Sequence, residues 1–248
     1  MSKYCVQVTW QDVPHLTPED IEELEREIPP HMRDARTKGI PILGAGAIYP
    51  VPESLIVCEP FDIPQFWPRA FGFDADWNRT AAIWGAWDRE SDVVYLYSEH
   101  YIGQQPPSVH ADAIKRRGIW MPGAMDPSTN GKLNPKDGSR LSDEYRSLGL
   151  NLIEADNAVE AGILACYQRF AAGRLKVFRS LVNTLAEFRI YRRDEKGKVV
   201  KQNDHLMDAA RYLIMTGLLH ATVEPRDDEE DDWNRQQASR SRSAITGY

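Results

Sequence analysis

Three runs of apolar residues in the first half of the chain predict neighbouring β-strands. The runs are AFGFDADWN at 70–78, AAIWGAWD at 81–88 and SDVVYLYSEHY at 91–101. Short polar segments with turn-forming residues separate each run from the next. Because the runs follow one another so closely, we expect them to form a three-stranded antiparallel meander.

After residue 105 the pattern changes to an alternation of helical and strand-like segments. The predicted helices are 106–118, 141–148, 157–172 and 203–219, and the predicted strands are 119–126 and 151–154. Ahead of the last helix, FRIYRRDEKGKVVK at 188–201 predicts a β-hairpin with Gly197 in its turn. A meander followed by alternating strands and helices indicates an α/β sandwich built on a mixed sheet.

The chain divides into three regions. Residues 1–68 are expected to form a linker or approach segment, with one helix beginning at TPED (17–20). The Gly- and Pro-broken apolar pieces at 40–57 suit either a linker or a small edge strand. Residues 69–222 hold the predicted α/β domain, in which 127–140 are expected to form a mobile surface loop. Residues 223–248 are acidic and then rich in Ser and Arg, which predicts a disordered tail.

The composition argues against membrane-spanning and secreted proteins. The chain has 42% hydrophobic and 27% charged residues, and it contains no apolar run of the roughly 20 residues that a membrane-spanning helix needs. The N-terminal residues do not read as a secretion signal, and three widely spaced cysteines indicate reduced thiols. We therefore expect a protein that is neither secreted nor bound to a membrane.

The net charge of −7 argues against a protein that coats nucleic acid. However, the stretch EPRDDEEDD at 224–232 carries seven acids and one arginine, so the remainder of the chain is close to neutral. A local basic surface is therefore compatible with the composition. The sequence contains no P-loop, no GxSxG elbow and no HExxH motif.

Two aspartates lie at the ends of predicted strands. Asp74 and Asp76 share one face of the first strand, whose other face is apolar and aromatic. Asp126 ends a later strand, where α/β folds commonly place binding groups. Each has an ordinary alternative: Asp74 can belong to the solvated face of an edge strand, and Asp126 can be a turn residue before Pro-Ser.

The last helix brings a third acid. Asn203 or Asp204 is a natural N-cap, but Asp208 lies a full turn further along and capping does not explain it. His205, Asp208 and Tyr212 fall on a second face of this apolar helix. That face either meets solvent or borders a polar site.

One arrangement connects these acids. If the last helix packs across the first strand, Asp74, Asp126 and Asp208 converge, and three ionised carboxylates at short range repel one another unless a cation is bound. Oxygen ligands suit Mg²⁺ or Mn²⁺, and a pair of such ions can hold the attacking and leaving oxygens of a phosphoryl displacement. His205 could add a ligand or move a proton. We therefore expect one or two divalent ions.

The strings FDAD (73–76), DPS (126–128) and NDHLMDAARY (203–212) resemble the nuclease domain of the large terminase subunit of tailed double-stranded DNA bacteriophages. The resemblance covers residues 69–222 and implies a ribonuclease H-like mixed sheet with flanking helices and an added β-hairpin. It implies that Asp74, Asp126 and Asp208 are catalytic metal ligands. His205, Asp76 and Asp204 are further candidate ligands.

The same resemblance implies a function. We expect a metal-dependent endonuclease that cleaves double-stranded DNA during viral genome packaging, by two-metal-ion hydrolysis with little sequence specificity, in the cytoplasm of the infected bacterial host. Seven basic residues are candidates for phosphate contact as a set, although any one of them taken alone is better explained by a solvated helix or hairpin face: Lys115, Arg116, Arg117, Arg189, Arg192, Arg193 and Lys201.

Residues 1–68 resemble the passage that follows the ATPase domain in full-length subunits, and the Walker motif of that domain does not occur in this sequence. The implied partners are that ATPase domain, the portal and the small terminase subunit. Two alternatives stay open. One is a junction resolvase or transposase with the same fold; the other is a docking module of the packaging motor that does not cut on its own.

Overall fold

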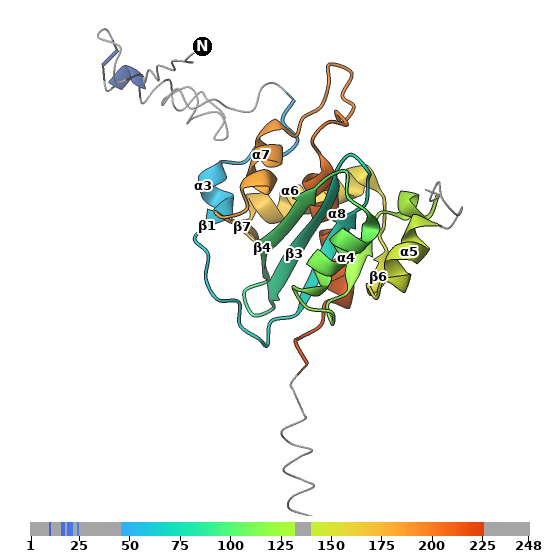
Figure 1. Ribbon diagram of the computed structural model, residues 1–248. Helices are drawn as coiled ribbons and strands as arrows, with labels where there is room; N and C mark the ends of the chain where they lie inside the picture. The colour runs from blue at the N-terminus through green and yellow to red at the C-terminus, as the bar shows by residue number, and fades with distance from the viewer. Residues whose placement is uncertain are drawn as a thin grey trace, which may run out of the picture.

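The molecule is built around a seven-stranded mixed sheet with the order β1-β7-β4-β3-β2-β5-β6 (Figure 1). The computed structural model describes residues 46–131 and 140–225, together with a few residues before 25. The strands are β1 Val57–Cys58, β2 Arg69–Asp74, β3 Thr80–Asp88, β4 Val93–Ile102, β5 Gly123–Met125, β6 Leu152–Glu154 and β7 Leu175–Phe178. The helices are α3 Glu53–Ile56, α4 Pro107–Lys115, α5 Leu141–Ser147, α6 Val159–Ala171, α7 Val182–Ile190 and α8 His205–Met215, with 3₁₀ turns η3 Pro127–Gly131 and η4 Gly217–His220.

The predicted meander is confirmed. Strand β3 pairs antiparallel with both β2 and β4, and one irregularity in register lies between Trp84 and Gly85. Strands β5 and β6 extend the sheet in parallel on the β2 side, while β7 and β1 extend it in parallel on the β4 side. The result is the mixed sheet that the sequence pattern indicates.

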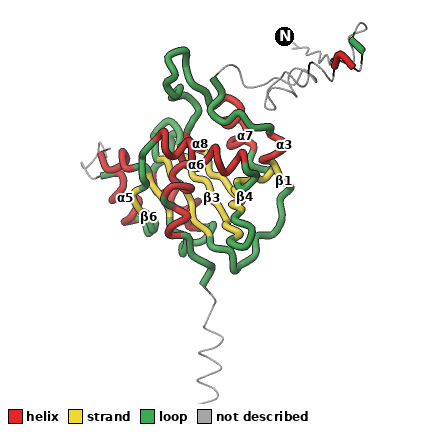
Figure 2. The backbone as a smooth tube through the Cα atoms, turned by 180° about the vertical axis from the view of Figure 1, so that it is seen from behind, coloured by secondary structure: helices red, strands yellow, loops and turns green. Residues whose placement is uncertain are grey.

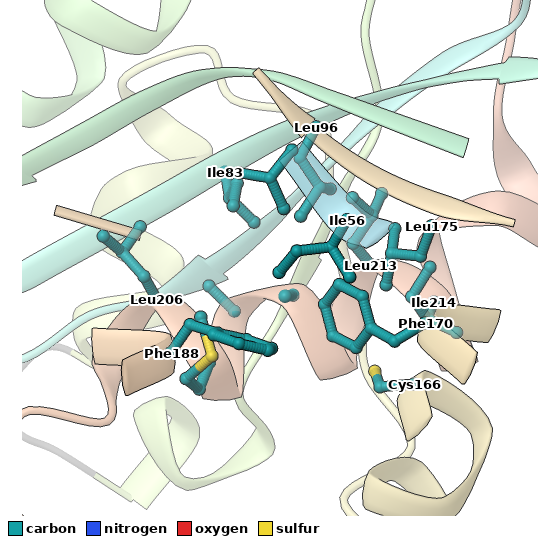
Figure 3. Packing of buried hydrophobic residues seen from close by; sticks show 14 of the residues in the cluster. Ile56, Ile83, Leu96, Cys166, Phe170, Leu175, Phe188, Leu206, Leu213 and Ile214 are labelled. Atoms are coloured by element: carbon teal, nitrogen blue, oxygen red, sulfur yellow. The ribbon is translucent and has the colours of Figure 1, made fainter. Parts of the chain in front are cut away.

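Helices cover both faces of the sheet. Helix α4 lies in front of it in Figure 1, and α5 lies at the side next to β6. Helices α6 and α8 cover the opposite face, which is seen from behind in Figure 2. Apolar side chains fill the space on each side. The cluster beneath α6 and α8 includes Ile83, Leu96, Phe170 and Leu213 (Figure 3). This burial of apolar surface on both faces is the main stabilising contribution to a sandwich of this kind.

Helix α8 packs very closely against β2. A Cβ atom added to Gly72 would lie 1.8 Å from the backbone oxygen of Ala209, so no other residue fits at position 72 without movement of the backbone. Gly72 and Asp74 lie on the same face of β2, and Ala209 follows Asp208 directly. The close approach therefore brings the end of β2 and the first turns of α8 together.

The predicted hairpin begins later than expected. Residues 188–190 form the last turn of α7, and the antiparallel bridge joins Arg193 to Val199 around a turn with Gly197 at φ 77°. The helix forms because Glu99 on β4 accepts hydrogen bonds from the backbone and side chains of Asn183 and Thr184, at the start of α7. Strand β7 and helix α7 were not predicted, whereas β1 lies at the end of the segment for which a small edge strand was one of two expectations.

Residues 46–68 are integrated into the domain. Tyr49 and Ile56 are buried in the larger apolar cluster, and β1 forms one edge of the sheet. The predicted helix start at 17–20 shows its capping hydrogen bonds, since the hydroxyl of Thr17 accepts from the backbone of Asp20. Residues 132–139 of the predicted loop and 226–248 of the predicted tail lie outside the described residues, and the predicted boundaries at 68 and 222 stay predictions.

Among the helices in the described ranges, none has the length and apolar character required to cross a membrane.

Candidate active site

Asp74 and Asp126 lie side by side at the carboxyl ends of two parallel strands. Phe73 of β2 pairs with Met125 of β5, and the backbone N–H of Asp126 donates a hydrogen bond of 3.1 Å to the carbonyl of Phe73. Both carboxylates are buried. The two acids, 52 residues apart in sequence, therefore meet at one edge of the sheet.

A short turn fixes the side chain of Asp126. The backbone N–H of Ser128 donates to Oδ1 at 2.9 Å, and the Ser128 hydroxyl donates to Oδ2. The two interpretations of Asp126 are thus compatible, because the residue organises the turn and also ends a strand beside Asp74. Hydrogen bonds of this type hold a carboxylate in one orientation.

Helix α8 places Asp208 and His205 across from these strands. His205 Nδ1 lies 2.9 Å from Asp74 Oδ2, and this hydrogen bond is the main reason why the pKa of His205 is raised. Burial opposes the shift, and the charges of Asp74, Glu187 and Asp204 support it. Asp208 is buried one turn further along the helix. The second face of α8 therefore borders a polar site.

The electrostatic surroundings of Tyr212 and the close packing of α8 on β2 both indicate that the three acids share one region. Burial is the largest reason for its raised pKa, followed by the negative charges of Asp126 and Asp208 and, with a smaller effect, of Asp74. A single phenol on α8 thus lies within electrostatic reach of all three carboxylates. They are gathered around one edge of the sheet and are not scattered over separate surfaces.

Two cations neutralise Asp208. Lys201 Nζ lies 2.7 Å from Asp208 Oδ2 and 3.2 Å from Asp204 Oδ2, and Arg211 Nη2 lies 3.2 Å from Asp208 Oδ1. Burial lowers the pKa of Lys201, but the hydrogen bonds and charges of Asp208 and Asp204 outweigh it, so the pKa is raised. The sequence predicted neither pairing, although it singled out Lys201.

The N-terminus of α8 is capped from another helix. Asp204 occupies the N-cap position but its side chain makes no capping hydrogen bond, which corrects the predicted role. The buried carboxylate of Glu187 on α7 accepts instead, from the backbone N–H groups of Leu206 at 2.6 Å and Met207 at 3.3 Å. An acid inside the apolar run TLAEFRI is the sequence signal that could have identified Glu187.

Asp76 has a structural role in the next turn. Its Oδ1 accepts a hydrogen bond of 2.9 Å from the backbone N–H of Asn78, and its carbonyl accepts one from the Thr80 hydroxyl. This geometry is an Asx turn, and it accounts for the acid without a metal ion.

The predicted phosphate contacts fall into two groups. Lys115 ends α4, and Arg116 and Arg117 begin the connection that leads into the amino end of β5. Asp126 lies at the opposite, carboxyl end of that strand, beside the end of β2. The guanidinium of Arg117 already has hydrogen-bond partners within the domain, since it donates to Ser98 Oγ and to two backbone carbonyls. The contact of Arg117 with DNA stays a prediction.

The second group begins with Arg189 in the last turn of α7 and continues beyond that helix. Arg189 pairs with Glu53, and Arg193 pairs with Glu160 at 2.6 Å, so both guanidinium groups already have carboxylate partners. Arg192 is exposed. Lys201 is the member of the predicted set that touches the carboxylate cluster.

The donor chemistry at this edge fits a hard divalent ion, since every acidic side chain there offers carboxylate oxygens. The ammonium of Lys201 between Asp204 and Asp208 shows that the cluster attracts a cation. Over the described ranges, no group of three or more His, Cys, Asp or Glu side chains is placed so that it could hold one metal ion as it stands.

Comparisons with known proteins agree with this geometry. The family model of the terminase RNase H-like domain matches residues 70–216. The large terminase subunits of Enterobacteria phage LP7 and Salmonella phage P22 are each 34% identical to the chain, over 88% and 86% of its length. The chain spans about half of each relative, 47% and 44%.

Solved structures lead to the same family. The nuclease domain of the P22 large terminase superposes with a TM-score of 0.66 at 31% identity, and the match covers 73% of this chain and 96% of that domain. The large terminase of a thermophilic bacteriophage, solved in complex with ADP, shares the fold with a TM-score of 0.60 at 21% identity, over 85% of this chain and 54% of that one. Because the family model covers more than half of the residues, the chain belongs to the terminase RNase H-like domain family.

Proposed function

We propose that this chain is a metal-dependent endonuclease that cleaves double-stranded DNA during viral genome packaging, with little sequence specificity. One observation carries the proposal. Asp74 and Asp126 end adjacent parallel strands, and α8 brings Asp208 to the same edge, in a chain of the terminase RNase H-like family. The family result favours a terminase nuclease over a junction resolvase or a transposase.

Asp74, Asp126 and Asp208 are the proposed ligands of one or two Mg²⁺ or Mn²⁺ ions. The nuclease of the thermophilic phage G20c, which has the same fold at 13% identity and a TM-score of 0.53, was solved with bound magnesium. Bound ions would supply Lewis-acid stabilisation of the charge that develops on a phosphate during hydrolysis. His205 and Asp204 are further candidate ligands. The Asx turn gives Asp76 a structural role that does not require a metal ion.

The side chains around the carboxylates orient them. Ser128 holds both oxygens of Asp126, and His205 holds Oδ2 of Asp74. His205 can transfer its proton to Asp74, or keep the proton and stabilise the ionised carboxylate of Asp74. Arg211 fixes Oδ1 of Asp208 from the buried side, which leaves Oδ2 toward Lys201.

The test replaces Asp126 by Asn, which keeps an acceptor oxygen and removes the charge. Plasmid cutting in Mn²⁺ should fall by about 100-fold or more, and the rise in melting temperature that Mn²⁺ causes in the wild type should disappear, because a ligand that binds only the native state stabilises it. Asp143→Asn is the matched control, since Asp143 is an exposed acid on α5 that pairs with Arg146. Undiminished cutting by folded Asp126→Asn would exclude the proposed metal site.

Because the chain spans about half of its curated relatives, the activity of the whole packaging motor is also part of the proposal. We propose that this domain works with an ATPase domain, a portal and a small terminase subunit in the cytoplasm of the infected host.

A second candidate function is a docking module whose cutting is latent. One observation favours it: both oxygens of Asp208 are occupied by the cations of Lys201 and Arg211. Deletion of residues 224–248 should then abolish binding to a portal or motor subunit and leave any cleavage unchanged. If binding survives the deletion, the tail is not the contact.

A further inference from the structure

The turn between β2 and β3 adjoins the carboxylate edge and carries two side chains that the proposed chemistry does not use. Asp74 ends β2 and Thr80 begins β3, so residues 75–79 lie next to the candidate site. Trp77 and Arg79 are the largest side chains of this turn.

The backbone of this turn is tied down at several points. Asn78 N–H donates to Asp76 Oδ1, and the N–H of Gln104, beyond the end of β4, donates to the carbonyl of Trp77 at 2.7 Å. A Cβ atom added to Gly103 would lie 1.9 Å from the backbone oxygen of Asn78, so the two connections are in close contact. The turn therefore holds its side chains in defined positions.

Trp77 is 65% exposed in spite of this fixed backbone. By contrast, Trp84 on the neighbouring strand is completely buried. A single exposed apolar residue needs no explanation on its own. Trp77 is therefore an indole held in water by a fixed turn, three residues along the chain from Asp74.

Arg79 is pre-positioned by an aromatic ring. Its guanidinium lies 4.5 Å from the centre of the Tyr101 ring, and the Tyr101 hydroxyl interacts with Glu187, which caps α8. Arg189 and Arg193 pair with carboxylates, but Arg79 forms no ion pair with any residue in the described part of the chain. A guanidinium that stacks on a ring keeps its N–H donors available for a phosphate.

We propose that Trp77 and Arg79 form a DNA contact that positions the cleaved strand, with Arg79 on a backbone phosphate and Trp77 against the sugar and base of the adjoining nucleotide. The inference rests on the proposed nuclease function and extends it. Contact with aromatic rings tolerates any base, since every base has an apolar face, and this agrees with cutting of low sequence specificity. Neither residue was singled out as a DNA contact from the sequence.

The two contacts predict different salt dependences. Binding of the whole chain to a fluorescently labelled duplex of about 30 base pairs is measured by anisotropy in EDTA, at several salt concentrations. Arg79→Ala should reduce the slope of log affinity against log salt by about 0.9, the value for one phosphate contact. Trp77→Ala should weaken binding about tenfold at every salt concentration and leave the slope unchanged.

Conservative variants separate a contact from a structural role. Trp77→Phe should retain most of the affinity, because the ring remains, and Arg79→Lys should restore the salt slope, because the charge remains. Acrylamide should quench the tryptophan fluorescence of the wild type less strongly when the duplex is bound, because the duplex covers Trp77. This protection from quenching should be smaller in Trp77→Phe.

The chain offers matched controls at other positions. Arg89 stacks over Trp87 at 5.1 Å in the turn at the far end of β3, and Ile119 is 65% exposed on the connection into the amino end of β5. Arg89→Ala and Ile119→Ala should bind DNA as the wild type does.

Affinities of Trp77→Ala and Arg79→Ala within about twofold of the wild type, with an unchanged salt slope, would overturn the inference while leaving the proposed nuclease intact. Undiminished cutting by Asp126→Asn would instead overturn the nuclease, whatever the result at Trp77.

Discussion

Arg211 is a buried arginine next to a proposed metal ligand. It is 1% exposed, and besides Asp208 its guanidinium contacts Asn157 Oδ1 at 3.4 Å and lies over the ring of Tyr212. Gly162 on α6 provides the space, since a Cβ atom there would lie 2.3 Å from Arg211 Cγ. Such a fixed cation reduces the repulsion among the clustered acids even when no ion is bound.

Loss of this cation should destabilise the fold. Arg211→Met leaves the buried carboxylate of Asp208 with Lys201 as its remaining cation, and we expect the free energy of unfolding to fall by about 3 kcal/mol. Arg211→Lys should lose less, because an ammonium can still reach Asp208. Chemical denaturation with and without Mn²⁺ measures both effects. Unchanged stability of Arg211→Met would show that Arg211 is not the counter-ion of Asp208.

Lys201 should compete with a metal ion for Asp208. Its ammonium lies 2.7 Å from Oδ2, the oxygen that Arg211 leaves free, and it must move before a divalent ion can use that oxygen. We therefore expect Lys201→Ala to bind Mn²⁺ several-fold more tightly in calorimetric titration, because the like-charge competitor is removed. Lys198→Ala, an exposed lysine in the same segment, is the control. Equal or weaker binding by Lys201→Ala would contradict the competition.

At the scale of single residues, the sequence reveals buried acids more readily than the cations that pair with them. An aspartate on an apolar face is visible in a single sequence because burying it without a partner is costly, so Asp74 and Asp208 could be singled out. The cations that balance Asp208 could not be assigned. Lys201 reaches it from outside the helix, and Arg211 points inward only because Gly162 leaves room for it.

Among the elements, two glutamates orient the helices that build the site. Glu99 on β4 caps α7, and Glu187 on α7 caps α8. Each carboxylate accepts hydrogen bonds from backbone N–H groups that have no partner inside their own helix and favour negative charge. The position of Asp208 therefore depends on a chain of contacts that begins on the central sheet.

Removal of the second cap should loosen α8. Glu187→Ala leaves the N–H groups of Leu206 and Met207 unsatisfied, and we expect a loss of about 2 kcal/mol in the free energy of unfolding. Glu187→Gln should lose less, because it retains an acceptor oxygen without the cost of a buried charge; burial raises the pKa of Glu187. The control is Glu90→Ala in an exposed turn. Equal stability of Glu187→Ala and wild type in urea denaturation would contradict the capping role.

Element prediction succeeded where local pattern and tertiary environment agree. The meander has long apolar runs with clear turns, and all three of its strands were found. Strand β1 has two residues and β7 has four, too short for a periodic signal. Helix α7 buries Thr184 and Glu187 together with apolar residues, so it lacks a simple apolar stripe. Its first turn is capped by Glu99, which is 84 residues away from Asn183 in sequence.

For the molecule as a whole, the site occupies one edge of a sheet that is packed on both faces. Strands β2 and β5 run parallel, so their carboxyl ends meet there, and α8 begins at the same edge. Positions outside the carboxyl ends of strands are the usual binding sites of open α/β sheets. The general location could therefore be predicted from topology, whereas the contacts of individual side chains required the three-dimensional structure.

Two hydrogen-bonded histidines are buried on one face of the sheet. On the face covered by α4, His100 Nε2 lies 2.8 Å from His110 Nδ1, and His110 Nε2 lies 3.2 Å from the carbonyl of Gln105. Burial, together with the charges of His110 and Arg117, lowers the pKa of His100 to about 4. Burial also lowers the pKa of His110. This pair joins α4 to β4 in its neutral form.

Stability should therefore decrease on acidification. In the unfolded chain both histidines take up protons near pH 6.5, while in the folded protein His100 resists protonation until about pH 4. The stabilising effect is complete above pH 6.5 and is lost as the pH falls toward 4, with a decrease in the free energy of unfolding of about 3 kcal/mol. His110→Gln should show a smaller decrease over this range, because one of the two rings is gone, although it is less stable at neutral pH. His220→Gln, an exposed histidine, should follow the wild type. Urea denaturation from neutral pH down to about pH 4 measures the difference, and parallel curves for wild type and His110→Gln would show that the buried pair does not set the acid response.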